Sequence, residues 1–293
     1  MGTTTFSGPV RSENGFQSVA KNSTTGQIQV TSLHSNSDKD TRRYYLDEWF
    51  KQRPAINADI DQAYTVEVAR AANRDFEALG TNMTTALVTF DSDRAGIVIT
   101  TAGADQDQSI LAPHLDTNQS SWTGVKWGTE NSVIWECAVS TNAIDNQKWW
   151  AGLKLTNDQL IATDANQAFF KFQTDATNSE AFTDFTLLHF VHSIGGTDYI
   201  SALPITIAAN TVYRLKIEID SDRKASIFVD GIQYNVTSTA GSTGGTAVTS
   251  GTTKSAALTD DVDFIPYIGI EAGAAAAEAL DVHYQAMSRD LFE

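Results

Sequence analysis

Three acidic clusters are the first candidates for chemistry in this chain, because each places carboxylates close together in sequence. They are the pairs Asp91/Asp93 and Asp105/Asp107 and the trio Asp260, Asp261 and Asp263. Calcium takes about six to eight oxygen ligands, and carboxylates two residues apart in a loop supply some of them. No cluster has the full spacing of a known calcium loop. Surface solubility is therefore the leading interpretation and we expect no cofactor, with calcium as the one alternative that the sequence suggests.

The histidine and cysteine side chains are weaker candidates for a metal site or for catalysis. His189 and His192 form a close pair, but residues three apart on a strand point to opposite faces, so one ion would not reach both. Cys137 is the only cysteine, which excludes an intrachain disulfide and a cysteine-based zinc site, and its alternating apolar surroundings predict a buried thiol. No Ser-His-Asp grouping or phosphate loop is readable. We expect no catalytic residues and no enzymatic activity.

Tryptophans are the candidates for stacking on sugars, namely Trp122, Trp127 and Trp150. A large β-protein core absorbs most tryptophans, because they bury more apolar surface than any other side chain. Burial in the core is therefore the leading interpretation for all three, and exposure to a glycan is the alternative.

The elements that would position these residues are short strands. From about residue 63 onward, apolar and polar residues alternate with period 2. The clearest run is 213–220, which turns and returns as 225–229, and similar runs lie at 133–139, 148–155 and 264–270. Many short strands with turn signals and little helix predict an all-β, antiparallel sandwich or barrel.

The N-terminal region differs from the rest of the chain in composition and pattern. Residues 1–40 are polar with isolated apolar residues, which predicts an extended arm with at most one short strand pair. Residues 41–53 fit a short helix, with Asp40 as its cap and Pro54 as its stop. We therefore expect two parts, an arm with a helix over 1–55 and a β-sandwich domain over 56–293.

Charge excludes several partners. The formal net charge is −16 and the isoelectric point about 4.6, so nucleic-acid phosphates and anionic membranes would be repelled. No apolar stretch reaches the ~18 residues of a membrane span, and the N-terminus has no secretion signal. We expect synthesis in a cytoplasm.

The late strands carry a family resemblance. The hairpin 213–231, ending in Asp230-Gly231, resembles one found in concanavalin A-like and laminin-G-like sandwiches, as do the closing strands 264–270 and 280–284. The resemblance covers roughly residues 80–290 and implies a two-sheet jelly roll. It does not fix function, because this fold hosts lectins, hydrolases and inert scaffolds.

Glucanases with this fold carry a strand of the form Glu-x-Asp-x-x-Glu, in which acid and nucleophile flank the sugar bond. Glu218-Ile219-Asp220 matches the first half, but Arg223 stands where the second glutamate belongs. The resemblance therefore implies no assembled pair of catalytic carboxylates, and the strand face is expected to be solvated.

A second resemblance concerns the start of the chain. Residues 4–16, together with 101–119 and 128–131, resemble virion proteins of tailed phages that infect aquatic bacteria. Such proteins include capsid decoration, or cement, proteins. The resemblance implies a structural protein on the capsid surface of a virion, made in the host cytoplasm.

Two functions follow as hypotheses. The first is a capsid decoration protein that binds the major capsid protein and copies of itself, with a trimer favoured. Its contacts would come from apolar residues of the arm and helix. These are Phe6, Pro9, Val10, Phe16, Tyr45, Trp49 and Phe50. The alternative is a tail-fibre or receptor-binding module that recognises a host surface glycan.

Overall fold

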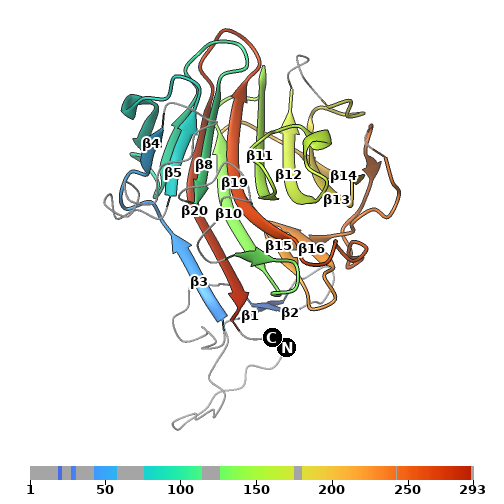
Figure 1. The fold of residues 1–293 in the computed structure, drawn as a ribbon. Coiled ribbons are helices and arrows are strands. Elements are labelled where there is room, and N and C mark those ends of the chain that lie inside the picture. Colours follow the sequence, from blue (N-terminus) through green and yellow to red (C-terminus); the bar gives the residue numbers. More distant parts are fainter. Residues whose placement is uncertain are drawn as a thin grey trace, which may run out of the picture.

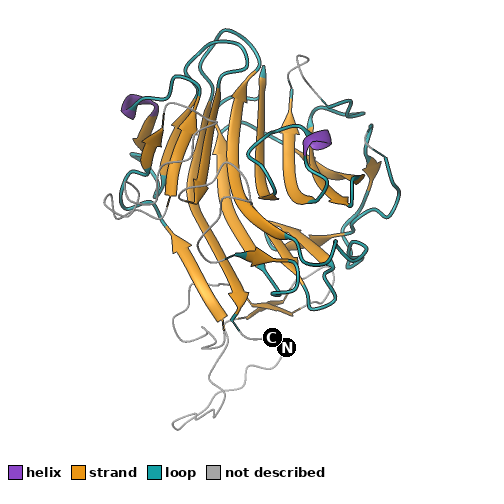
Figure 2. Cartoon of the chain, in the orientation of Figure 1, coloured by secondary structure: helices purple, strands orange, loops and turns teal. Residues whose placement is uncertain are grey.

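Alternating strands build two facing β-sheets, as the sequence predicts (Figure 1). The computed structural model describes residues 19–21, 28–30, 43–57, 76–113, 126–174, 180–241 and 243–291. Helix in this part is limited to two single turns, η1 (Thr85–Leu87) and η2 (Ile161–Thr163), as Figure 2 shows. The fold is an all-β, two-sheet jelly-roll sandwich. No helix among the described residues is long and apolar enough to cross a membrane.

One sheet has eight strands and includes the hairpin that the alternation at 213–229 predicts. In order across the sheet they are β17 (Ile232–Tyr234), β16 (Ala225–Val229), β15 (Tyr213–Ile219), β10 (Ile134–Thr141), β20 (Ala279–Asp290), β7 (Ile97–Thr100) and β6 (Val88–Phe90). The eighth, β3 (Arg43–Glu48), pairs with the second half of β20. All these pairings are antiparallel.

The other sheet has ten strands. In order they are β18 (Thr246–Ala247), β14 (Thr197–Thr206), β13 (Leu187–Ile194), β12 (Gln167–Gln173), β11 (Gln147–Lys154), β19 (Asp263–Ala272), β8 (Gln108–Pro113), β5 (Phe76–Gly80) and β4 (Ala55–Asn57), while β9 (Trp127–Gly128) pairs with β19. Its two edge pairings, β14–β18 and β4–β5, are parallel. Separately, β1 (Val19–Lys21) and β2 (Ile28–Val30) form the short strand pair expected in the arm.

The prediction of a helix over 41–53 was wrong, because residues 43–48 form β3 and residues 49–53 are not helical. Tyr44 and Leu46 pack toward the core, whereas Tyr45 points outward opposite Ser288 of β20. The i, i+4 pairs that suggested a helix fit a strand equally well, and the open edge of β20 decides between them by offering backbone hydrogen bonds. Residues 43–48 and 55–57 therefore lie within the sandwich sheets, one segment in each.

The core lies between the sheets and contains the inward half of each alternating run. Trp149, Ala151 and Leu153 point into it from β11, and Trp135 and Cys137 point into it from β10. The prediction of a buried thiol is confirmed, and burial raises the pKa of Cys137. Stacking two inner faces in this way leaves two outer faces, and these differ sharply in exposure.

Candidate functional site

The outer face of the ten-stranded sheet is buried, although it carries many long polar side chains. Lys148 and Lys154 project from β11 and Lys171 from β12, and all three are 0% exposed. Lys148 is ion-paired with Glu271 of β19 at 2.5 Å. Burying three cations costs free energy unless each is ion-paired and hydrogen-bonded, so the partners of each lysine decide whether this arrangement is stable.

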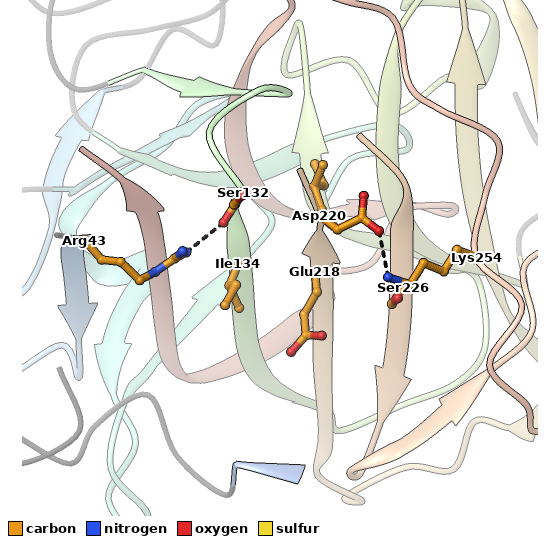
Figure 3. Close-up of a pocket in the computed structure, with 8 residues that line it drawn as sticks. Arg43, Ser132, Ile134, Glu218, Asp220, Ser226 and Lys254 are labelled. Atoms are coloured by element: carbon orange, nitrogen blue, oxygen red, sulfur yellow. Dashed lines mark hydrogen bonds and ion pairs between the residues drawn. The ribbon is translucent and has the colours of Figure 1, made fainter. Parts of the chain in front are cut away.

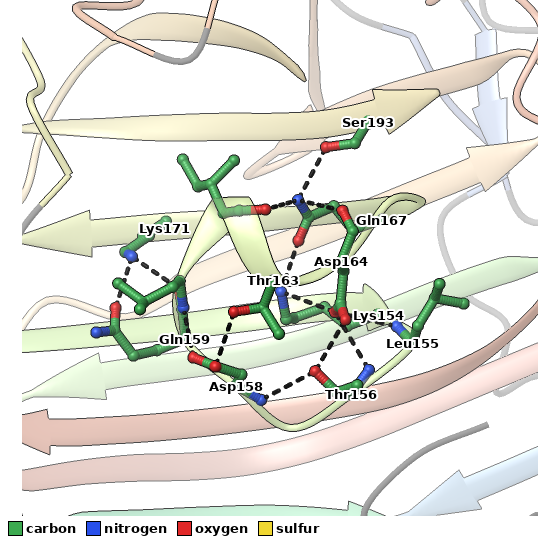
Figure 4. Close-up of polar contacts among 12 residues, drawn as sticks. Lys154, Leu155, Thr156, Asp158, Gln159, Thr163, Asp164, Gln167, Lys171 and Ser193 are labelled. Carbon is green, nitrogen blue, oxygen red and sulfur yellow. Dashed lines mark hydrogen bonds and ion pairs between the residues drawn. The ribbon is translucent and has the colours of Figure 1, made fainter. Parts of the chain in front are cut away.

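Connecting loops supply the partners of two of these lysines (Figure 4). Lys154 Nζ lies 3.2 Å from the carboxylate of Asp164 and donates to Gln167 Oε1 at 2.6 Å. Lys171 Nζ donates to the backbone and side-chain oxygens of Gln159, each at 2.7 Å. Burial lowers the pKa of Lys154 and lowers that of Lys171 to about 8. The polar row thus joins the sheet to the loop 155–166 above it.

The outer face of the eight-stranded sheet contains an open hollow (Figure 3). Its volume is about 200 Å³. Its lining mixes carboxylates, cations, hydroxyls and aliphatic carbon, contributed by Arg43, Ser132, Ile134, Glu218, Ile219, Asp220, Ser226 and Lys254. The alternation of β15 and the turn after it place Glu218 and Asp220 in the same hollow. Arg43 and Lys254 come from distant parts of the chain.

Ion pairs hold the charged groups of the hollow. Lys254 Nζ donates to Asp220 Oδ2 at 2.7 Å, and Arg43 donates to the carbonyl oxygen of Ser132 at 2.7 Å. Burial alone would raise the pKa of Asp220, but its hydrogen bonds, led by that from Lys254, outweigh burial and lower it. Glu218 is ion-paired with Lys216. Each of the two carboxylates therefore has an ammonium partner.

Arg223 lies apart from this hollow. Its guanidinium is 3.2 Å from the carboxylate of Asp260 and donates to the carbonyl oxygen of Leu258. The hollow offers fixed hydrogen-bond acceptors and donors.

An aromatic pair lies farther along the same face. The rings of Trp49 and Tyr284 are 5.0 Å apart, and Trp49 is 40% exposed. The hydroxyl of Tyr284 donates to Glu136, and burial, followed by the charge of Glu136, raises the pKa of this phenol. Tyr284 pairs with Ala138 of β10, four residues from Ile134 in the hollow, or roughly 13 Å along the strands.

A third group lies at the other end of β20. Asp281 and His283 meet Asp91 from the loop after β6, and ligand atoms of the three lie within 4.8 Å of one another. Ser140 Oγ is 2.8 Å from Asp281 Oδ2 and 3.2 Å from His283 Nε2. The sequence identified Asp91 as a calcium candidate but missed the other two residues. The spacing of Asp281 and His283, two apart in an alternating run, was the signal available.

Two further calcium candidates, Asp107 and Asp263, make local contacts in the structure. Asp107 accepts a hydrogen bond from the backbone of Ala104, and Asp263 pairs with Lys126 at 2.8 Å. The prediction that His189 and His192 face opposite sides of their strand agrees with their neighbours, since His189 stacks on Phe182 of a covering loop. His192 stacks on Tyr199 of the adjacent strand at 4.7 Å.

The predicted interface and stacking residues have mixed outcomes. Phe6, Pro9, Val10, Phe16 and Trp122 lie outside the described residues. Trp127 and Trp150 are buried, as the core interpretation expects, and Phe50 is buried against Phe76. Tyr45 is half-buried and Trp49 exposed on the outer face of the eight-stranded sheet. An interface role for these two residues stays a prediction.

Comparison with known proteins bears on the fold. No family model matches the chain, and no curated protein matches it. Similar solved structures include the family 7 alginate lyase A1-II′, at 13% identity and a TM-score of 0.44, covering 71% of this chain and 86% of the lyase. The carbohydrate recognition domain of Emp47p has 8% identity, a TM-score of 0.42 and coverages of 74% and 90%. A protein of unknown function from Shewanella oneidensis MR-1 has 8% identity, a TM-score of 0.46 and coverages of 86% and 88%.

These neighbours have the concanavalin A-like jelly-roll fold that the late strands suggested, and the named ones are carbohydrate-binding or glycan-active proteins. Several are alginate lyases, which overturns the expectation that this chain is not an enzyme. The identity of a phage virion protein, and the capsid decoration role derived from it, gain no support from these matches.

Proposed function

We propose that this protein recognises a glycan on the outer face of its eight-stranded sheet. The observation that carries the proposal is the open hollow around Glu218 and Asp220, about 200 Å³ in volume and lined by both hydrogen-bond donors and acceptors. Small-ligand sites combine apolar surface with a few placed polar groups, and a sugar ring presents both kinds of surface. The hollow has room for roughly one such ring.

The lining suits sugar hydroxyl groups. The carboxylates of Glu218 and Asp220 each keep acceptor capacity beyond their ion pairs, since a carboxylate has about four lone-pair sites. Lys254 and the hydroxyl of Ser226 supply donors, and Ile134 supplies an apolar surface. Because ion pairs already fix these charged side chains, less conformational entropy is lost when a ligand binds.

Trp49 extends the surface beyond one sugar unit. Its ring is exposed and is held in place by Tyr284, whose hydroxyl is in turn held by Glu136. Aromatic rings with one exposed face suit the apolar faces of sugars. A glycan of a few units lying obliquely across β15, β10 and β20 would contact both the hollow and this ring.

The net charge of the protein favours neutral glycans over acidic ones. A charge of −16 sets up a field that disfavours polyanions, so a neutral glycan is proposed in preference to a polyuronate such as alginate. From the sequence resemblance to virion proteins, we further propose that such a module has a receptor-binding role on a phage particle. That location, self-association as a trimer and the absence of nucleic-acid or membrane partners remain parts of the proposal.

A glycan array with purified protein tests the proposal, with neutral and uronic-acid glycans side by side. Titration of the best neutral glycan into Glu218→Gln and Trp49→Ala should give affinities at least about tenfold weaker than for the unaltered protein. Asp222→Asn, in the exposed turn after β15, is the matched control and should bind normally.

Two outcomes would count against the proposal: no reproducible binding to any neutral glycan, or equal affinities for the unaltered protein and both variants. The same glycans, incubated with protein and followed for new reducing ends and unsaturated uronate, report catalysis in addition to binding.

A further inference from the structure

The cluster of Asp91, Asp281 and His283 brings three ionisable side chains together from two separate parts of the chain. Asp91 begins the loop between β6 and β7, whereas Asp281 and His283 lie near the start of β20. Among the described residues, this is the one group of three histidine, cysteine or acidic side chains whose ligand atoms lie this close together. It shares no residue with the proposed glycan surface, although His283 directly precedes Tyr284 in β20.

Hydrogen bonds hold the side chains of the cluster in place. Asp91 Oδ1 accepts from the backbone N–H groups of Asp93 at 2.8 Å and Arg94 at 3.0 Å, while Oδ2 lies 3.7 Å from His283 Nδ1. The hydroxyl of Ser140 lies between Asp281 and the imidazole. The backbone contacts of Asp91 are outer contacts of the kind that orients metal ligands in known sites, whereas the Ser140 hydroxyl links two of the ligand groups directly.

Close packing of the loop on the strand keeps the two halves of the cluster together. A Cβ atom at Gly96 would lie 2.6 Å from the Cα atom of His283 and 2.2 Å from the carbonyl oxygen of Val282. Only glycine permits this approach, and its φ of +119° lies in the region that glycine favours. The carbonyl oxygen of Ala95, next to it, lies 3.1 Å from His283 Nδ1.

The donor set indicates which ion fits. Imidazole nitrogen with two carboxylate oxygens suits zinc and similar transition ions, whereas calcium needs about six to eight oxygen ligands, more than the side chains here supply. Around a tetrahedral zinc ion with bonds near 2.0–2.1 Å, ligand atoms are about 3.3 Å apart. The ligand atoms of the three groups lie within 4.8 Å of one another, so binding would draw them together by up to about 1.5 Å.

We propose that Asp91, Asp281 and His283 form a binding site for a single divalent transition ion of the zinc class. The ion joins the loop 91–96 to β20 and neutralises two half-buried carboxylates. Solvent fills the remaining coordination position. The proposal does not depend on glycan recognition.

Isothermal titration of zinc chloride into the full chain, prepared without a histidine tag, tests the site. We expect one zinc ion bound per chain at neutral pH, with a higher melting temperature. His283→Gln and Asp91→Asn should each weaken binding at least about tenfold. Asp93→Asn removes the same charge from the same loop, outside the cluster, and should bind zinc normally.

Cobalt(II) gives a second readout, because visible absorption of the bound ion reports its ligand geometry. Should His283→Gln fail to fold, Asp91→Asn in the surface loop still decides the question. Zinc binding that is equally strong in Asp91→Asn and the unaltered protein would overturn the proposal. A stronger preference for calcium than for zinc would overturn it as well.

Discussion

Replacing Asp164 by alanine is the sharpest test of the buried polar row. Asp164 is 3% exposed. Its carboxylate accepts from the backbone N–H groups of Leu155 and Thr156, at 3.3 and 3.2 Å, and from the hydroxyl of Thr156 at 2.8 Å, besides pairing with Lys154. Asp164→Ala removes all of these contacts while the ammonium group of Lys154 stays covered.

The expected loss follows from what remains around Lys154. Gln167 Oε1 at 2.6 Å and the ring of Phe169 at 4.3 Å are its other described partners, and neither carries a compensating charge. Removing one member of a buried ion pair costs about 3–5 kcal/mol. We expect Asp164→Ala to lower the free energy of unfolding by about that amount, as measured by urea denaturation at pH 7.

Two further variants make the test specific. Asp158→Ala removes a more exposed carboxylate from the same loop, one that accepts hydrogen bonds from Leu160 and Thr163, and should cost about 1–2 kcal/mol. Lys154→Met in the Asp164→Ala background should recover part of the loss, because no unpaired charge is left buried. If Asp164→Ala were no more destabilising than Asp158→Ala, the loop 155–166 would not be held by this pair.

Three other measurements probe the same packing. Burial lowers the pKa values of His189 and His192 from about 6.5 to about 4, so the unfolded state binds more protons between these limits. The free energy of unfolding should then fall by up to about 3 kcal/mol per histidine as the pH drops from 6.5 to 4. In His192→Phe, the urea midpoint should depend less on pH over this range than in the unaltered protein. The pKa of Lys171 falls from 10.5 to about 8, so stability should rise as the pH increases from 8 toward 10.5, and Lys171→Met should lose this rise in the same titration. Gly269→Ala would place a methyl group 2.3 Å from the buried ring of Trp150 and should lower the free energy of unfolding by about 1–3 kcal/mol. A melting temperature equal to that of the unaltered protein would refute this packing.

Alternation was enough to predict most long strands, because a period of 2 reports directly which side chains face the core. The runs at 133–139 and 148–155 became β10 and β11 with the inward residues as expected. Residues 43–48 were misassigned because their local pattern fits both helix and strand, and the deciding partner, β20, lies more than two hundred residues away.

The site residues were harder to predict for the same reason. Glu218 and Asp220 share a hollow, as their spacing suggests, but Arg43 and Lys254 join them only through the tertiary fold. Lys154 and Lys171 alternate with core residues, a pattern typical of a solvated face, and only the covering loop makes them buried. Local sequence says which face a side chain occupies, whereas exposure depends on what packs over that face.

The central claim is that ligand binds the open face of the eight-stranded sheet and not the covered face of the other sheet. Hydrogen–deuterium exchange, with and without the best neutral glycan from the array, tests this directly. The account predicts slower exchange in 213–226 and 43–49, with no change in 155–166. Protection confined to 155–166 and the outer face of β11 and β12 would contradict it, since the ligand would then have entered beneath the loop.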